Sequence, residues 1–230
     1  MKRFYKEAKA APGEGGFQVL LDGRPVKTPG RQTLTLPTAA LADAIAQEWR
    51  GQGGEIVPTS MPLLRLANSA QDGVAQNRAA TIEAILKFGA SDLLCYRAEA
   101  PDLAARQRAA WDPLLAWAEL SLDAGLKATQ GIGHISQPEG ALAALEAALD
   151  ARDEFELAAL HVMASITGSL ILAMAVAAEK MTAAEAFALS RLDETFQQER
   201  WGTDHEAEQR AKALGAEMDA AARFLELARA

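Results

Sequence analysis

Residues 17–27 read FQVLLDGRPVK, with the dipeptide Asp22-Gly23 at the centre of the stretch. Apolar and other side chains alternate before this dipeptide, and Arg24-Pro25 follows it. An Asp-Gly pair between two such runs favours a tight β-hairpin, because both central turn residues need positive φ angles. Pro25 indicates that the returning strand lies at a sheet edge or starts late, since proline cannot donate a backbone hydrogen bond.

A third strand is expected shortly after the hairpin. Thr28-Pro29-Gly30 is typical of a turn, and residues 32–36 (QTLTL) alternate again between polar and apolar side chains. Residues 12–16, which precede the hairpin, are typical of a flexible loop. The N-terminal part is therefore predicted to be a small, mostly antiparallel sheet.

Helical periodicity takes over after this sheet. Thr38 is a favoured N-cap residue just before an amphipathic segment. The apolar face of that segment carries Leu41, Ile45 and Trp49. Little of the later chain is typical of a strand, and helical segments are expected near residues 61–75, 78–88, 91–96, 102–124, 138–150, 153–179, 183–201 and 204–228.

These patterns predict the α+β fold class, with a small β-rich N-terminal domain followed by a larger all-helical domain. The first domain, with the hairpin and one helix, is expected over residues 1–58 and the multi-helical domain over residues 59–230. Hydrophobic residues make up 50% of the chain, so a core of ordinary size needs no disulfide or metal. The single cysteine, Cys95, lies in an apolar stretch and is expected to be buried.

Two capping boxes mark helix starts near the C-terminus. Thr182 is followed three residues later by Glu185, and an apolar segment comes next. Thr203 and Glu206 have the same spacing before the last helical segment. In such a box the hydroxyl and the carboxylate accept from backbone N–H groups that the first helical turn leaves unpaired.

The charge balance argues against nucleic-acid binding. The chain has 23 Lys and Arg against 31 Asp and Glu, a net charge of −8, and it has no basic run. Residues 1–6 are basic, but no apolar segment follows them, so we expect no targeting segment and a bacterial cytoplasmic protein. Residues 158–178 are apolar but rich in alanine and hydroxyl side chains, which favours a buried helix over stable membrane insertion.

No motif for catalysis or cofactor binding stands out. Residues 13–16 lack the Gly-Lys-Ser/Thr of a phosphate-binding loop, and Gly131-Ile132-Gly133 lacks the third glycine of a dinucleotide site. His205-Glu206 begins like a zinc-protease helix, but residue 209 is glutamine. We therefore predict no enzyme activity, no cofactor, no metal and no small-molecule substrate. A hydrolase or metal enzyme built from distant residues is kept as an alternative.

Residues 193–206 (DETFQQERWGTDHE) are dense in acids and contain two large aromatic side chains. Paired carboxylates can serve general acid–base chemistry. They are also favourable charges at a helix start. Acids beside aromatic residues can form a recognition surface, because aromatic residues anchor interfaces and exposed acids pair with basic partners.

At this motif, residues 192–207 resemble the C-terminal signature of the ATP synthase α-subunit assembly chaperones of mitochondria and α-proteobacteria. Other blocks of the chain resemble the family in the same order, and their order is far more specific than any block alone. These blocks are residues 3–6, 21–29, 44–49, 61–70, 91–97 and 111–117, with Gln107 between the last two.

The resemblance implies a molecular chaperone that binds the unassembled α subunit of F-type ATP synthase. It would shield the α-subunit surface that later pairs with a β subunit, and leave as the hexamer forms. The resemblance also implies the same two-part fold, with no ATP hydrolysis by the chaperone. A general holdase or adaptor with other clients is the alternative.

The acidic motif is the predicted partner-binding site. We expect its acids to form an edge beside two aromatic side chains that contacts the client. The alternative is that both aromatics belong to the core and the acids are helix caps and solvated surface. Arg65, Asp92 and Arg97 are expected to form structural pairs in the helical domain. The predicted partner-binding residues are Asp193, Phe196, Glu199, Trp201, Asp204 and Glu206.

Overall fold

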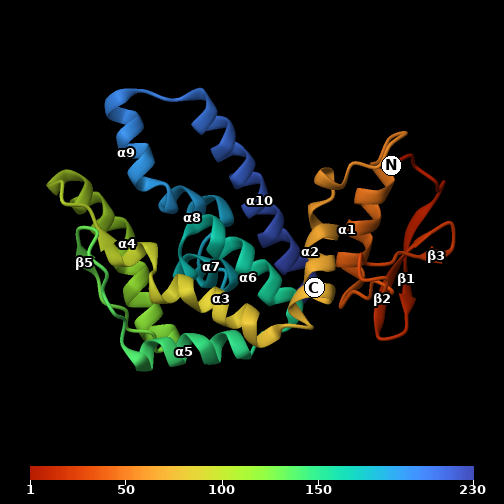
Figure 1. Cartoon of the computed structure of the whole chain (residues 1–230), viewed down its shortest axis with the longest axis horizontal. Coiled ribbons are helices and arrows are strands. Elements are labelled where there is room, and N and C mark those ends of the chain that lie inside the picture. Colours follow the sequence, from red (N-terminus) through yellow and green to blue (C-terminus); the bar gives the residue numbers. More distant parts are fainter. The chain divides into compact units, whose positions relative to one another are not determined.

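The computed structural model describes residues 1–230 and divides into two compact units. Unit 1 comprises Met1–Arg78, Asp153–Ala159 and Ala220–Ala230. Unit 2 comprises Ala79–Arg152 and Leu160–Asp219. The strands β1–β3 belong to unit 1, and most helices of the chain belong to unit 2, as expected for an α+β fold (Figure 1). The division into domains at residues 1–58 and 59–230 stays a prediction.

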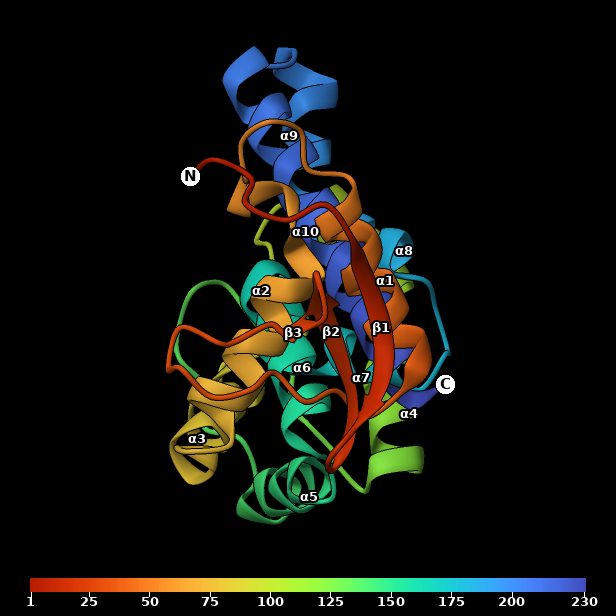
Figure 2. The ribbon, with the colours of Figure 1, turned by 90° about the vertical axis from the view of Figure 1, so that its right-hand side faces the viewer.

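The sheet of unit 1 has three antiparallel strands in the order β1-β2-β3 (Figure 2). They are β1 (Ala8–Gly13), β2 (Gly16–Leu21) and β3 (Arg24–Pro25). The predicted hairpin turn between β2 and β3 is confirmed, because Asp22 and Gly23 have φ angles of 48° and 81°. The loop expected at residues 12–16 is shorter than predicted: Pro12 and Gly13 pair with Phe17 and Gly16, and only Glu14 and Gly15 form a turn.

The strand expected at residues 32–36 is present only as isolated bridges. Phe17 and Leu36 exchange both of their backbone hydrogen bonds, at 2.9 and 2.8 Å, and Lys27 pairs with Thr33. A side chain at Gly16 would place its Cβ 2.4 Å from the carbonyl oxygen of Leu36. Glycine therefore permits the close backbone approach that brings this segment to β2.

Helix α1 (Ala39–Arg50) packs on β1 and β2 and begins as predicted. The Thr38 hydroxyl oxygen accepts from the backbone N–H of Leu41 at 3.1 Å. Leu41 and Ile45 are fully buried, and Trp49 is 7% exposed. The next helix, α2 (Pro62–Asn68), is tied to α1 by the Glu48 carboxylate, which accepts from two N–H groups of its first turn.

The C-terminal end of α10 (His205–Arg229) and the start of α6 (Glu154–Thr167) complete unit 1. The Phe155 and Phe224 rings lie 6.1 Å apart, and both are buried. Arg229 pairs with Glu156 at 2.5 Å. These contacts join two segments of unit 1 that lie far apart in the sequence.

Unit 2 surrounds α7 (Leu170–Ala177), whose eight side chains are all buried. Its other elements include a short parallel pair, β4 with β5, that the sequence did not indicate. They are α3 (Arg78–Ala90), β4 (Tyr96–Arg97), α4 (Pro101–Leu122), β5 (Thr129–Gln130), α5 (Glu139–Asp150), α8 (Ala183–Ser190) and α9 (Leu192–Trp201). Short 3₁₀ turns at Pro58–Ser60 and Leu93–Cys95 and a π-helical turn at Ser69–Val74 link elements of the chain.

The apolar segment 158–178 is two helices rather than one. Gly168 has a φ angle of 67°, which ends α6, and the Ser169 hydroxyl caps α7 by accepting from Leu172 at 3.0 Å. No helix of the structure combines the length and apolarity needed to cross a membrane. Cys95 is buried as predicted, and burial raises the pKa of its thiol to about 12.

Of the two predicted capping boxes, one is confirmed. The Thr182 hydroxyl accepts from Glu185 N–H while the Glu185 carboxylate accepts from Thr182 N–H. The box at Thr203 is wrong, because α10 begins one residue later than that pattern requires. The Asp204 carboxylate accepts from the N–H of Glu206 at 3.0 Å instead.

Candidate functional site

All six predicted partner-binding residues lie on α9, on the start of α10 or between them. Figure 1 shows the two helices joined by a short connection, with α9 beside α4. Hydrogen bonds, ion pairs and ring contacts to α4 determine which of these side chains are covered. The six residues divide into two that are partly or fully covered and four that solvent reaches.

Asp193 joins α9 to a buried amide on α4. Gln107 is 1% exposed and donates from Nε2 to the Asp193 carboxylate at 2.7 Å. The Oε1 atom of the same amide accepts from the backbone N–H of Ala98 at 2.7 Å. A buried amide needs partners on both sides, so Asp193 positions α9 on α4.

Phe196 is 5% exposed and lies between two cations. The guanidinium of Arg106, on α4, is 5.0 Å from the ring centroid, and that of Arg200 is 4.1 Å away. A guanidinium over an aromatic face is attracted by the negative face of the ring. Phe196 therefore belongs to the α4–α9 contact.

Two ion pairs flank this ring. Glu199 accepts from Arg106 at 2.7 Å, and Asp102 accepts from Arg200 at 3.1 Å. Asp102 and Arg106 are four residues apart and thus share one face of α4. All four side chains are about half exposed or more, so each pair contributes only about 0–1 kcal/mol to stability. Their arrangement fixes where the Glu199 carboxylate lies.

Trp201, by contrast, is 76% exposed at the last position of α9. Gly202 follows with a φ angle of 86°, and the chain turns into α10. The two aromatics therefore have different surroundings: the core interpretation holds for Phe196 and not for Trp201. A solvent-exposed tryptophan carries a large apolar area that a partner can cover.

Asp204 and Glu206 are exposed at the start of α10, and neither forms an ion pair. Asp204 caps the helix, and both carboxylates lie where the helix macrodipole favours negative charge. We name Glu199, Trp201, Asp204 and Glu206 the α9–α10 surface. It combines one large aromatic side chain with three carboxylates.

The residues of α4 that hold this site were missed by sequence reasoning. Asp102, Arg106 and Gln107 lie 86 to 98 residues before their partners, and a local pattern cannot pair positions so far apart. No group of three or more His, Cys, Asp or Glu side chains suited to a metal ion is present. The six residues include no nucleophile–base pair.

Comparison with known families decides the identity. The sequence model of the ATP12 chaperone protein matches residues 2–119. The chain belongs to the ATP12 chaperone family. Members of this family function in ATP synthase assembly. The family is a chaperone family rather than an enzyme family.

Solved structures agree with the ATP12 assignment over the whole fold. Atp12 from Paracoccus denitrificans is 45% identical, with a TM-score of 0.95 over 99% of this chain and 98% of that one. A mutant of it with lysine in place of an aspartate matches equally well. The Atu1473 protein from Agrobacterium tumefaciens is 46% identical, with a TM-score of 0.94 over 98% of this chain and 85% of that one.

Proposed function

We propose that this ATP12 chaperone binds the unassembled α subunit of F-type ATP synthase. It shields the α-subunit surface that later pairs with a β subunit, and it is released when that pairing occurs. The observation that carries the proposal is family membership, supported by 45% identity to Paracoccus Atp12 over 99% of the chain. Close likeness over the full length supports a shared function rather than a shared fold alone.

A holding role fits the physical problem of assembly. A subunit of an obligate complex exposes a large apolar interface until its partner arrives, and such surfaces aggregate. A chaperone must cover that surface and still be displaced by the true partner. Contact through a few anchor residues meets both needs, since a few side chains carry most of the binding energy at an interface.

The α9–α10 surface is our proposed contact with the client. Trp201 supplies an exposed apolar anchor, and Glu199, Asp204 and Glu206 supply negative charge for a basic patch on the partner. In this proposal Asp193 and Phe196 act indirectly, because their contacts with α4 position the helix that carries the surface.

Variants of this surface give the first prediction. Trp201→Ala and Glu199→Lys should each weaken binding of purified, unassembled α subunit by about tenfold, the effect of losing an interface anchor or reversing a contact charge. Calorimetric titration measures the affinity. Both side chains are substantially exposed, so the midpoint of thermal unfolding should change by only a few degrees.

The matched control is Glu146→Lys, which makes the same charge change at an exposed position on α5. This control should bind the α subunit like the unmodified protein. Affinity that is unchanged in Trp201→Ala and Glu199→Lys would discard the α9–α10 surface as the contact. Equal protection of unrelated aggregating proteins would favour a general holdase over a dedicated α-subunit chaperone.

A further inference from the structure

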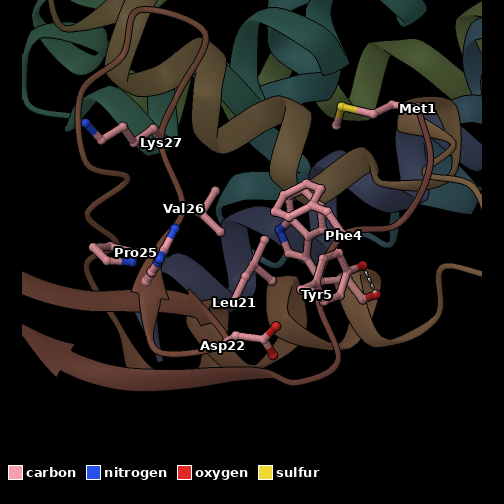
Figure 3. Close-up of a pocket in the computed structure, with 10 residues that line it drawn as sticks. Met1, Phe4, Tyr5, Leu21, Asp22, Pro25, Val26 and Lys27 are labelled. Atoms are coloured by element: carbon pink, nitrogen blue, oxygen red, sulfur yellow. Dashed lines mark hydrogen bonds between the residues drawn. The ribbon is translucent and has the colours of Figure 1, made fainter.

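An open pocket of about 670 Å³ lies within unit 1, formed by the N-terminal segment, the β2–β3 hairpin and α1. Figure 3 shows Met1, Phe4 and Tyr5 on one side and Val26 and Lys27 on the other. None of its lining residues belongs to the α9–α10 surface. A volume of this size accommodates a ligand of several residues.

One wall of the pocket is an unusual row of aromatic rings. Phe4 meets Tyr5 edge to face at 5.5 Å, and Tyr5 meets Trp49 in the same way at 5.4 Å. The inner rings are buried, but Phe4 is 65% exposed and Met1 is 76% exposed. Large apolar side chains at a pocket mouth offer surface that a bound ligand can cover.

A buried donor without a partner lines the same pocket. The indole N–H of Trp49 is closed from solvent and has no hydrogen-bond acceptor, although the residue is only 7% exposed. An unpaired buried donor is rare and costly in native proteins. A carbonyl oxygen that reaches the indole N–H from the pocket would satisfy it.

Three cations lie at or beside the pocket, and none of them forms an ion pair. Arg24 and Lys27 line it, are exposed and form no ion pair. Arg3 stacks on Tyr5 at 4.7 Å, and its guanidinium donates only to backbone carbonyls, those of Tyr5, Lys6 and Gln52. This positive cluster is local in a chain whose net charge is −8.

The one acid of the lining, Asp22, offsets only part of this positive charge. Asp22 accepts from the backbone N–H groups of Lys6 and Glu7 at 2.8 to 3.1 Å. Hydrogen bonds from Glu7 and Lys6 hold the pKa of Asp22 below its usual value. The ionised carboxylate fixes the hairpin to the N-terminal segment and interacts with Lys6 and Arg3, so the charges of Arg24 and Lys27 remain available to an anion.

We propose that this pocket binds an extended peptide segment of a partner protein, with a bulky apolar side chain next to a carboxylate side chain. The apolar side chain enters between Phe4 and Val26, a main-chain carbonyl accepts from Trp49, and the carboxylate pairs with Arg24 or Lys27. Charge complementarity favours the acidic residue, and the apolar lining favours its large neighbour. The site is independent of the α-subunit assignment.

The test uses the full chain labelled with ¹⁵N and the capped peptide acetyl-Gly-Leu-Asp-Phe-Glu-Gly-amide. The four tryptophans give four indole signals, and Trp49→Phe identifies the one from the pocket. The peptide should shift the Trp49 signal saturably. A matched peptide with lysine in place of both acids should bind at least tenfold more weakly.

The charge contacts are tested with the double variant Arg24→Glu, Lys27→Glu, which should lose at least tenfold in affinity. The control Arg108→Glu, Lys212→Glu makes the same charge change at exposed positions of unit 2 and should bind normally. Trp201→Ala should also bind the peptide normally, so failure of the α9–α10 proposal leaves this result unaffected.

Three outcomes would overturn the proposal. The first is an unmoved Trp49 signal at millimolar peptide, and the second is equal binding of the acidic and lysine peptides. The third is an equal shift produced by hexanoate alone, which would assign the pocket to a small carboxylic acid rather than to a peptide.

Discussion

Replacing Asp92 with asparagine should lower the free energy of unfolding by about 3 kcal/mol near pH 4 and by much less at pH 7, because the amide leaves a buried backbone N–H unpaired and lacks the proton that stabilises the folded state. Asp92 is fully buried. Its carboxylate accepts from the N–H of Leu94 at 3.0 Å and from the N–H of Ile171, in the first turn of α7, at 3.1 Å. Asparagine has the same shape, but its NH₂ group would face one of these donors.

The loss should also depend on pH. Burial raises the pKa of Asp92 to about 6, although hydrogen bonds from Ser169, Ile171, Leu94 and Leu170 act in the opposite direction. The folded protein therefore binds this proton more tightly than the unfolded chain does. Protonation stabilises the folded state, so the contribution of Asp92 is greatest below about pH 4 and declines as the pH rises to about 6.

Asparagine does not titrate. The difference in unfolding free energy between the unmodified protein and the variant therefore reports how the contribution of Asp92 changes with pH. The difference should grow as the pH falls from 7 to 4. It should grow by up to about 3 kcal/mol, because the pKa of Asp92 is raised by about two units on folding. Urea unfolding followed by circular dichroism measures it. The control Asp123→Asn, at an exposed left-handed position, should be neutral. A difference that shrinks toward low pH would contradict the raised pKa.

A second large effect is expected at the pair formed by Arg97 and Asp112. The arginine side chain is 5% exposed, whereas the aspartate side chain is 55% exposed. Arg97 also donates to the carbonyl of Leu94 and stacks over the Trp111 ring at 5.2 Å. Removing Asp112 therefore leaves a buried cation, whereas removing Arg97 leaves a carboxylate that water can reach.

Removing the exposed partner should do more damage than removing the buried one. Asp112→Ala leaves a buried cation without its anion and should cost about 2–3 kcal/mol, at the low end for a broken buried pair because solvent reaches the aspartate. Arg97→Met leaves only a hydrated carboxylate and should cost less. In the double variant, methionine should recover at least half of the Asp112→Ala loss. An Arg97→Met loss larger than that of Asp112→Ala would contradict this asymmetry.

Local signals were sufficient where a few neighbouring residues determine the conformation. Asp22-Gly23 predicted the hairpin, and Thr38 predicted the start of α1. Strand β1 was missed because Pro12 and Gly13 are typical of a loop, and only pairing with β2 makes them a strand. The break at Gly168 was also missed, because the apolar pattern continues on both sides of it.

At the candidate site, too, local spacing could be predicted from the sequence, but contacts between distant residues could not. Phe196 and Trp201 are five residues apart, which places them about 140° apart around an α-helix. They therefore face different directions, but the sequence does not say which direction α4 occupies. Arg106 and Gln107 decide it, and their contacts with α9 span 86 to 93 residues of chain.

Binding and release of the client can be followed with purified subunits. The purified protein is mixed with unassembled ATP synthase α subunit, the complex is isolated by gel filtration, and purified β subunit is then added. We predict a stable complex with the α subunit and none with the β subunit alone. Added β subunit should release the chaperone and leave α paired with β. Failure to bind the α subunit, or equal binding to both subunits, would rule out the proposed function.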